Sequence, residues 1–193
     1  MEQDIRDQFS ASAQTALASG ELLAGDIARA SRGIIGTIES GGKVLLCGNG
    51  GSASDALHFS AELLVRFERE RRALPAVALT GDTATLTAIG NDYDFAQVFS
   101  RQVEALANEG DHLVVITTSG NSVNILEAAR AAQRRGGITI TAFTGGDGGK
   151  LASFLGAEDI ELRVPSDNTA RIQEVHAIII HCLCRLIDNH FCG

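Results

Sequence analysis

Apolar residues recur at helical intervals through the first 40 positions, and the pattern then changes to short continuous apolar runs. The opening stretch predicts two helices, near 2–18 and 21–39, broken around Ser19-Gly20. Gly41-Gly42 ends the second helix. The short apolar runs that follow predict strands at 43–48, 75–80, 112–117, 138–143 and 160–164.

Longer amphipathic stretches separate the first four runs and predict helices near 53–68, 83–106 and 122–135. Strands that are apolar along their whole length and alternate with helices are typical of a parallel sheet covered on both faces. With right-handed crossovers, the pattern predicts an α/β fold, a three-layer, doubly wound, five-stranded parallel sheet of the flavodoxin-like kind, with extra N- and C-terminal helices.

A last helix is expected over 169–190. No internal repeat or low-complexity linker divides the chain, so we predict a single domain over 1–193. Its parts are N-terminal helices in 1–40, the sheet core in 41–165 and the C-terminal helix.

Composition narrows the class of protein. The 193 residues are 45% hydrophobic and 21% charged, as in ordinary globular proteins, and the formal net charge is −8. A general nucleic-acid binder needs a basic face, so we expect no nucleic-acid partner. The richest basic stretch, 66–72, alternates with glutamates and is interpreted as the solvated end of a helix.

We expect a cytoplasmic protein without a membrane segment. No stretch reaches the length of a membrane span, and the acidic N-terminus lacks the apolar core of a signal peptide. The four cysteines, at 47, 182, 184 and 192, match no zinc knuckle or redox pair. Reduced cysteines in a cytosolic core are the favoured interpretation.

The loop after the first expected strand, Gly48-Asn49-Gly50-Gly51-Ser52, is a candidate anion site. Its glycines let the backbone approach a ligand, and Ser52 can cap the following helix, with Asp55 three residues on. Helix N-termini attract anions. A dinucleotide fingerprint is disfavoured, because the final glycine and the acidic residue expected about 20 positions later are absent. A purely structural turn is the other alternative.

The loop after the third expected strand contains four hydroxyls within six positions, Thr117, Thr118, Ser119 and Ser122. Hydroxyl and backbone donors can form a phosphate cradle without lysine. The alternative is a turn with a helix cap. The stretch 144–150 resembles a Walker loop, but position 144 is not glycine and position 151 is neither serine nor threonine, so we expect a flexible turn.

Two further positions suggest metal binding or acid–base chemistry. His58 and Glu62 lie four residues apart on one expected helix face, where they can bind a metal, act as acid and base or form an ordinary helical pair. His181 lies in the apolar run of the last helix, so we expect it to be buried with a hydrogen-bond partner or a metal. His112 and His190 are expected on the surface.

Four segments together resemble one known family. GNGGSASDALHFSAEL, AIGNDY, TTSGNS and RIQEVHAIIIH are similar, in order and spacing, to the phosphoheptose isomerases of the SIS (sugar isomerase) family, and the resemblance covers nearly the whole chain. It implies conversion of sedoheptulose 7-phosphate into D-glycero-D-manno-heptose 7-phosphate, the first step of heptose biosynthesis for lipopolysaccharide.

The resemblance also implies roles for particular residues. Glu62 and His181 would be the acid–base pair. One zinc ion would be bound by His58, Glu62, Gln173 and His181. The substrate would be bound by Asn49, Gly50, Gly51, Ser52, Glu62, Asn91, Asp92, Thr117, Thr118, Ser119, Ser122 and Gln173. Relatives often have serine at the position of Thr117, which keeps the hydroxyl, and some have aspartate at the position of Ala170.

The zinc set has a geometric consequence. Gln173 and His181 are eight residues apart, about 12 Å along a regular helix, whereas zinc ligands lie about 2 Å from the metal. Either the helix is distorted or the two ligands come from different subunits of a symmetric oligomer, which the resemblance suggests is a homotetramer.

Two other functions compete with the isomerase interpretation. Some SIS proteins are non-catalytic and act in replication initiation through protein partners, but we expect other residues than Glu62 and His181 at those two positions in that branch. A sugar-phosphate sensor would require a DNA-binding module for which this chain has no room. The sequence therefore favours an isomerase.

Overall fold

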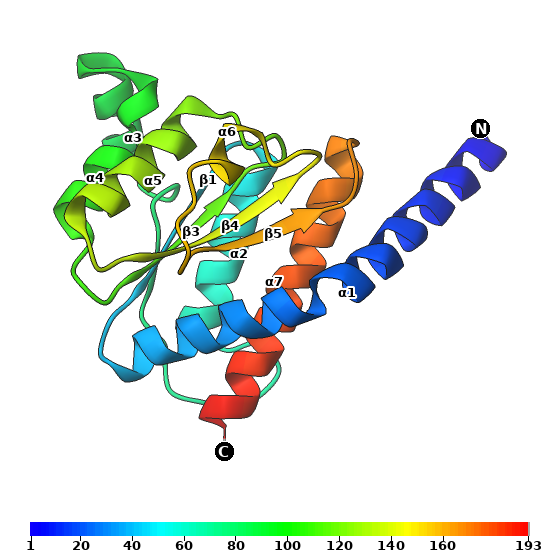
Figure 1. Ribbon diagram of the computed structural model, residues 1–193, viewed down its shortest axis with the longest axis horizontal. Helices are drawn as coiled ribbons and strands as arrows, with labels where there is room; N and C mark the ends of the chain where they lie inside the picture. The colour runs from blue at the N-terminus through cyan, green and yellow to red at the C-terminus, as the bar shows by residue number, and fades with distance from the viewer. Residues whose placement is uncertain (193) are drawn as a thin grey trace.

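The computed structural model describes residues 1–192 (Figure 1). Helices and strands alternate as the sequence predicts. The helices are α1 (Glu2–Glu39), α2 (Gly51–Leu64), α3 (Thr83–Asp92), the 3-10 helix η1 (Phe95–Gln97), α4 (Ser100–Leu106), α5 (Val123–Arg135), α6 (Gly149–Ala152) and α7 (Thr169–Phe191). The strands are β1 (Val44–Gly48), β2 (Ala76–Ala78), β3 (His112–Ile116), β4 (Thr139–Gly145) and β5 (Ile160–Val164).

The five strands form one parallel sheet in the order β2-β1-β3-β4-β5. This is the flavodoxin-like order, so the predicted fold class is confirmed. The chain leaves β1 toward β2 on one side and returns to β3 on the other. Ligands bind at such a reversal, beyond the carboxyl ends of the strands. The loops after β1 and β3 lie there.

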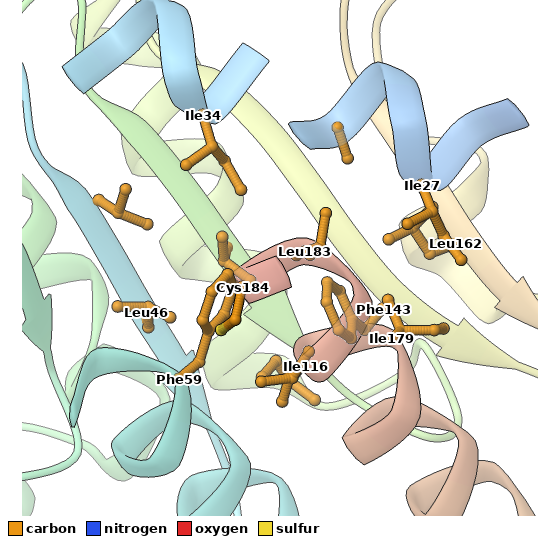
Figure 2. Packing of buried hydrophobic residues seen from close by; sticks show 14 of the residues in the cluster. Ile27, Ile34, Leu46, Phe59, Ile116, Phe143, Leu162, Ile179, Leu183 and Cys184 are labelled. Carbon is orange, nitrogen blue, oxygen red and sulfur yellow. The ribbon is translucent and has the colours of Figure 1, made fainter. Parts of the chain in front are cut away.

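Two apolar cores lie on opposite faces of the sheet. Alternate residues of β1 and β3 enter each core: Leu46 and Ile116 pack on one face, and Leu45 and Val115 on the other. The first core joins the sheet to α1, α2 and α7, and Figure 2 labels Phe59 of α2 and Leu183 and Cys184 of α7 among its residues. The second joins the sheet to α3, α4 and α5. The helices that carry the predicted site residues therefore rest on a closely packed layer.

The predicted break at Ser19-Gly20 was wrong, because α1 runs continuously from Glu2 to Glu39. The Ser19 hydroxyl donates to the carbonyl of Thr15 inside the helix, at 2.7 Å. One glycine costs a helix only about 1 kcal/mol, which packing of the helix onto the sheet offsets. Figure 1 shows the first turns of α1 extending past the rest of the molecule.

Two helix predictions differ in extent. The expected helix over 83–106 is divided into α3, η1 and α4, because Asp82 and Asp94 each accept a hydrogen bond from a backbone N–H and start a new element. The expected helix over 53–68 instead begins at Gly51 and ends at Leu64.

The prediction that the basic stretch 66–72 is the solvated end of a helix was wrong. It lies in the segment between α2 and β2, and the side chain of Arg71 is only 1% exposed. Arg71 forms an ion pair of 2.7 Å with Asp188 of α7. Charge alternation does not reveal that a connection folds back onto a distant helix.

The structure buries two histidines, His112 and His176, that the sequence did not predict to be buried. His112, predicted on the surface, is fully buried in β3 and lies 2.8 Å from the Thr141 hydroxyl. On α7 the buried histidine is His176, whose Nε2 lies 3.1 Å from the carbonyl of Thr144. His181, predicted to be buried, is exposed, and His190 is exposed as expected.

Acidification is expected to destabilise the fold through these two histidines. Burial lowers the pKa of His112 and of His176 from 6.5 to about 4, and the Thr144 carbonyl partly opposes the shift at His176. Between pH 6.5 and pH 4 these two histidines bind protons in the unfolded chain but stay neutral in the folded chain. The stability present at neutral pH is therefore lost as the pH falls toward 4. Each histidine should cost about 2 kcal/mol of unfolding free energy at pH 5.

Urea denaturation at pH 7.5 and pH 5 measures this loss. The matched variant His112→Gln keeps a side-chain donor for Thr141 but does not titrate, so it should lose markedly less stability over the same interval. An equal loss in the variant and the wild type would contradict the assignment to His112.

The cysteines and the question of a membrane span remain from the sequence analysis. The four cysteines are unpaired, with Cys47 and Cys184 buried and Cys182 exposed on α7. Within residues 1–192, none of the helices is both long and apolar enough to cross a bilayer.

Candidate active site

The loop after β1 brings the start of α2 to the switch point of the sheet. Gly50, with φ of 57°, is the N-cap residue of α2, and no side chain caps the helix. The expected capping role of Ser52 was therefore wrong, because the positive φ at Gly50 starts the helix two residues earlier. Ser52 lies inside the first turn and is 3% exposed. Ser52 is one of the residues that line a small pocket.

The loop after β3 forms the opposite wall of this pocket. Ser122 is the N-cap residue of α5, but its hydroxyl makes no capping hydrogen bond and lies 3.5 Å from that of Thr117. The hydroxyls are thus not consumed by the helix cap that was the alternative interpretation. Ser119 accepts a hydrogen bond from the backbone of Asn121, at 3.2 Å.

An asparagine pair locks the two loops together. Asn49 and Asn124 exchange two side-chain hydrogen bonds, both of 2.8 Å. Asn124 is 4% exposed, and sequence reasoning missed its role. An amide in the first turn of an expected helix gives no signal of a partner 75 residues away.

The pocket between the loops has a volume of about 160 Å³. It is lined by Asn49, Ser52, Ile116, Thr117, Thr118, Ser119, Ser122 and Gln173. None of these residues carries a charge, so an anion there would be held by hydroxyl, amide and backbone donors beside the N-terminus of α2. The pocket brings together most of the predicted phosphate ligands.

Gln173 of α7 closes the pocket. A Cβ atom at Gly51 would lie 2.6 Å from its Nε2 atom, so Gly51 leaves the space that the amide occupies. Gly50 therefore contributes a backbone conformation and Gly51 contributes space, whereas Gln173 contributes a side chain that lines the pocket.

His58, Glu62 and His181 gather where α2 packs against α7. His58 Nε2 lies 3.3 Å from Glu62 Oε1 and 3.4 Å from His181 Nε2. The His58 and Glu62 side chains are 36% and 23% exposed. Three groups that can exchange protons or bind a metal are therefore adjacent and open to solvent.

Asp55 lies one turn before His58, and sequence reasoning considered it only for capping. Its Oδ2 atom is buried without a hydrogen-bond partner in the described part of the chain. Burial raises the pKa of the Asp55 carboxyl, and the attraction of His58 partly opposes that shift. Asp55 thus adds a partly buried carboxyl one turn from His58 on the same helix.

The donor atoms partly fit a zinc ion. Tetrahedral zinc with nitrogen ligands at 2.0–2.1 Å places neighbouring donors about 3.3 Å apart, which matches both distances to His58 Nε2. Residues 1–192 nevertheless contain no group of three or more His, Cys, Asp or Glu side chains placed to hold one ion. The zinc site implied by the resemblance therefore stays a prediction, with three of its four expected ligands, His58, Glu62 and His181, close together in one chain.

Gln173 is separated from His181 by two turns of an unbroken helix. α7 is continuous from Thr169 to Phe191, so the distorted-helix alternative finds no support. Eight residues span about 12 Å along such a helix, which keeps Gln173 at the pocket and away from His181.

Asn91 and Asp92 are not brought to this pocket. They lie exposed at the end of α3, where Asn91 donates to Asp92 at 2.7 Å, and neither residue lines the pocket. Their contact with the sugar stays a prediction.

The stretch 144–150, predicted to be a flexible turn, contains regular secondary structure at both ends. It ends β4 and begins α6, and Gly145, Gly146 and Asp147 line a second cavity of about 370 Å³. Thr118 and Ser119 belong to both cavities, so the second adjoins the first.

Comparison with known proteins agrees with this architecture. A sequence model of the SIS domain matches residues 8–145, more than half of the chain. The phosphoheptose isomerase of Shewanella loihica is 54% identical over 185 residues, covering 96% of this chain and 93% of that protein. The phosphoheptose isomerase of Halorhodospira halophila is 58% identical over 171 residues, covering 89% and 86%.

Solved structures give the same result. The phosphoheptose isomerase from Francisella tularensis superimposes with a TM-score of 0.94 at 51% identity, covering 97% of each chain. The enzyme from Neisseria gonorrhoeae gives 0.92 at 46% identity, covering 97% of this chain and 98% of that one. The chain therefore belongs to the phosphoheptose isomerase family of SIS-domain proteins.

Proposed function

We propose that this chain converts sedoheptulose 7-phosphate into D-glycero-D-manno-heptose 7-phosphate through an enediol, in the cytoplasm, as the first step of heptose synthesis for lipopolysaccharide. The observation that carries the proposal is that α2 and α7 contribute both to an uncharged, hydroxyl-lined pocket, through Ser52 and Gln173, and to a His–Glu–His cluster further along the same helices. Relatives more than 50% identical bear the name of this activity.

The pocket would hold the phosphate. Ser52, Thr118, Ser119 and Ser122 supply hydroxyls, and the start of α2 supplies backbone N–H groups. Binding energy gathered at the phosphate positions the far end of the sugar, where the reaction takes place.

The reaction moves protons between two neighbouring carbons and their oxygens. One proton leaves C1 and one is delivered to C2, while a hydroxyl proton passes from O1 to O2. Glu62 and His181 would share the two transfers, one group acting at carbon and the other at oxygen. The number of protons on the sugar is unchanged, so no oxidant or reductant is required.

Zinc is proposed as the cofactor, held by His58, Glu62, Gln173 and His181. When bound, the ion would polarise the carbonyl and stabilise negative charge on the enediolate. Because Gln173 and His181 of one α7 lie too far apart for one ion, we propose that two subunits contribute to each site.

A homotetramer would supply the second subunit. The projecting part of α1 exposes apolar side chains that a monomer has no reason to display, with Ile5, Phe9 and Leu17 at 57%, 75% and 74% exposed. Leu64 and Val65 at the end of α2 and Ile178 on α7 are also exposed, at 45%, 68% and 46%.

The test is isomerisation of sedoheptulose 7-phosphate by the purified protein, with chelator and with added zinc, alongside static light scattering. Turnover that falls with chelator and returns with zinc is expected from a tetramer. A stable, active monomer would contradict the shared site. A folded oligomer without turnover under any metal condition would favour the non-catalytic binding-protein alternative.

A further inference from the structure

The segment between α2 and β2, residues 65–75 and hereafter the strap, lies against the C-terminal half of α7. It contains no regular helix or strand. Arg185 of α7 pairs with Glu68 at 3.2 Å, and Arg72 lies over the ring of Phe191 at 5.1 Å. The strap therefore contacts α7 at several points along its length.

A buried ion pair anchors the strap. Asp188 of α7 accepts hydrogen bonds from Arg71 Nε at 2.7 Å and from the backbone N–H groups of Glu68 and Arg69 at 3.0 and 3.2 Å. Arg71 in turn donates to the carbonyls of Leu63 and Glu62, at 2.9 and 2.6 Å. One pair of side chains thus ties together the strap, α7 and the last turn of α2.

The anchor holds Phe67 over His181. Their rings are stacked, with centroids 5.4 Å apart and planes inclined by 27°. The His58 ring approaches His181 in an edge-to-face arrangement, with centroids 5.0 Å apart and planes at 82°. His181 is otherwise exposed, so its imidazole is oriented between these two rings.

Stabilisation alone is a weak explanation for the Arg71–Asp188 pair. Burying two charges costs several kcal/mol in lost hydration, and apolar replacements of such pairs are often as stable. The pair instead fixes the position of α2 relative to α7, because it connects the backbone of Glu62 to the helix that carries His181.

We propose that the strap is a positioning element for proton transfer: the Arg71–Asp188 pair anchors it, and Phe67 sets the plane of the His181 imidazole. Phe67 and Arg71 act through His181 and Glu62 and touch no reacting atom. This inference rests on the proposed function of His181, and its test separates the two.

The experiment compares Phe67→Leu and Asp188→Asn with the control Phe154→Leu. Phe154 is likewise partly buried, but it packs on the opposite core. The first readout is the NMR signal of the His181 ring in full-length protein with labelled histidine, without metal or substrate, and assigned with His181→Gln. Phe67→Leu and Asp188→Asn should shift this signal, whereas Phe154→Leu and Phe67→Tyr should leave it in place.

The second readout is kinetic. Because misplacing a reacting group by about 1 Å can cost about 100-fold, kcat should fall about 10- to 100-fold in Phe67→Leu, with KM within about threefold of the wild type. Phe67→Tyr should retain kcat.

An unmoved His181 signal or an unchanged kcat in folded Phe67→Leu would overturn the proposal, even if Asp188→Asn fails to fold. If the wild type does not isomerise the substrate, the proposed function fails. The NMR signal then still decides separately whether the strap orients His181.

Discussion

Replacing Glu62 with glutamine is expected to lower kcat for sedoheptulose 7-phosphate by about 1,000-fold, since positioned acid–base groups contribute about 100- to 10,000-fold each. The amide keeps the shape of the carboxylate but cannot accept a proton. Glu62 lies on the last turn of α2, 3.3 Å from His58, with its backbone carbonyl bound by Arg71. Substitution should therefore remove chemistry without moving the backbone.

The matched control is Glu127→Gln. Glu127 also lies on a helix, is 29% exposed and pairs with the neighbouring Arg130, but it belongs to α5, away from the cluster. Its kcat should stay within about twofold of the wild type, as expected for a surface charge outside the site. A drop of less than about tenfold in Glu62→Gln would exclude Glu62 as a general acid or base.

Loss of chemistry should be separable from loss of binding. The phosphate pocket is built from the loops after β1 and β3, and Glu62 does not line it. Substrate binding by Glu62→Gln, measured by calorimetry, should therefore be little changed. A parallel loss of binding and turnover would instead assign Glu62 to substrate binding.

The sequence predicted the sheet well because its central strands, β1 and β3, are buried on both faces. Runs such as those of β1 and β3 leave no polar face, and only an internal parallel strand suits them. The position of the pocket between the loops after β1 and β3 could be predicted for a related reason, because the ends of such strands are where ligands bind in this class of fold. The four hydroxyls that follow β3, at the end of a central strand, indicated which loop to consider.

The errors arise where burial depends on partners far away in the chain. α7 is apolar on nearly every side, so the sequence did not show which of its histidines faces the core. The structure buries His176 and exposes His181. Arg71 was misplaced for the same reason, because its partner Asp188 is 117 residues away. Long-range contacts of this kind leave no local periodic signal.

The exposure of His181 changes how α7 should be understood. Ile178 and Leu186 are 46% and 38% exposed on the same helix, which runs past the His–Glu–His cluster. An apolar helix with one open face, beside an incomplete set of metal donors, is what a shared site would leave in an isolated chain. The apolar pattern that predicted a buried helix is therefore compatible with burial by a second subunit.

The second large effect is expected from Gly120→Ala in the loop after β3. Gly120 has φ of +63°, and a Cβ atom there would lie 1.9 Å from the carbonyl oxygen of Gly148. The clash is with backbone, so one of the two loops must move. Strain and overpacking together should cost about 2–5 kcal/mol of unfolding free energy.

The displaced loop carries the phosphate hydroxyls, so binding should suffer together with stability. Ser119 precedes Gly120, and the Gly120 carbonyl accepts a hydrogen bond of 3.0 Å from the backbone of Leu151. KM for the sugar phosphate should rise by at least about tenfold, because a shift of about 1 Å in the donors weakens their hold on the phosphate. Kinetics below the unfolding temperature, on protein shown to be folded by circular dichroism, measures this change.

Gly136→Ala separates clash from backbone strain. Gly136 also has a positive φ, of 77°, but a Cβ atom there would meet no atom within 4 Å, so backbone strain alone, of about 1–3 kcal/mol, is expected, with KM unchanged. If Gly120→Ala cost no more than Gly136→Ala and bound substrate normally, the contact with Gly148 would not shape the pocket. A larger cost and a raised KM in Gly120→Ala alone would show that phosphate binding depends on this backbone contact between the loops after β3 and β4.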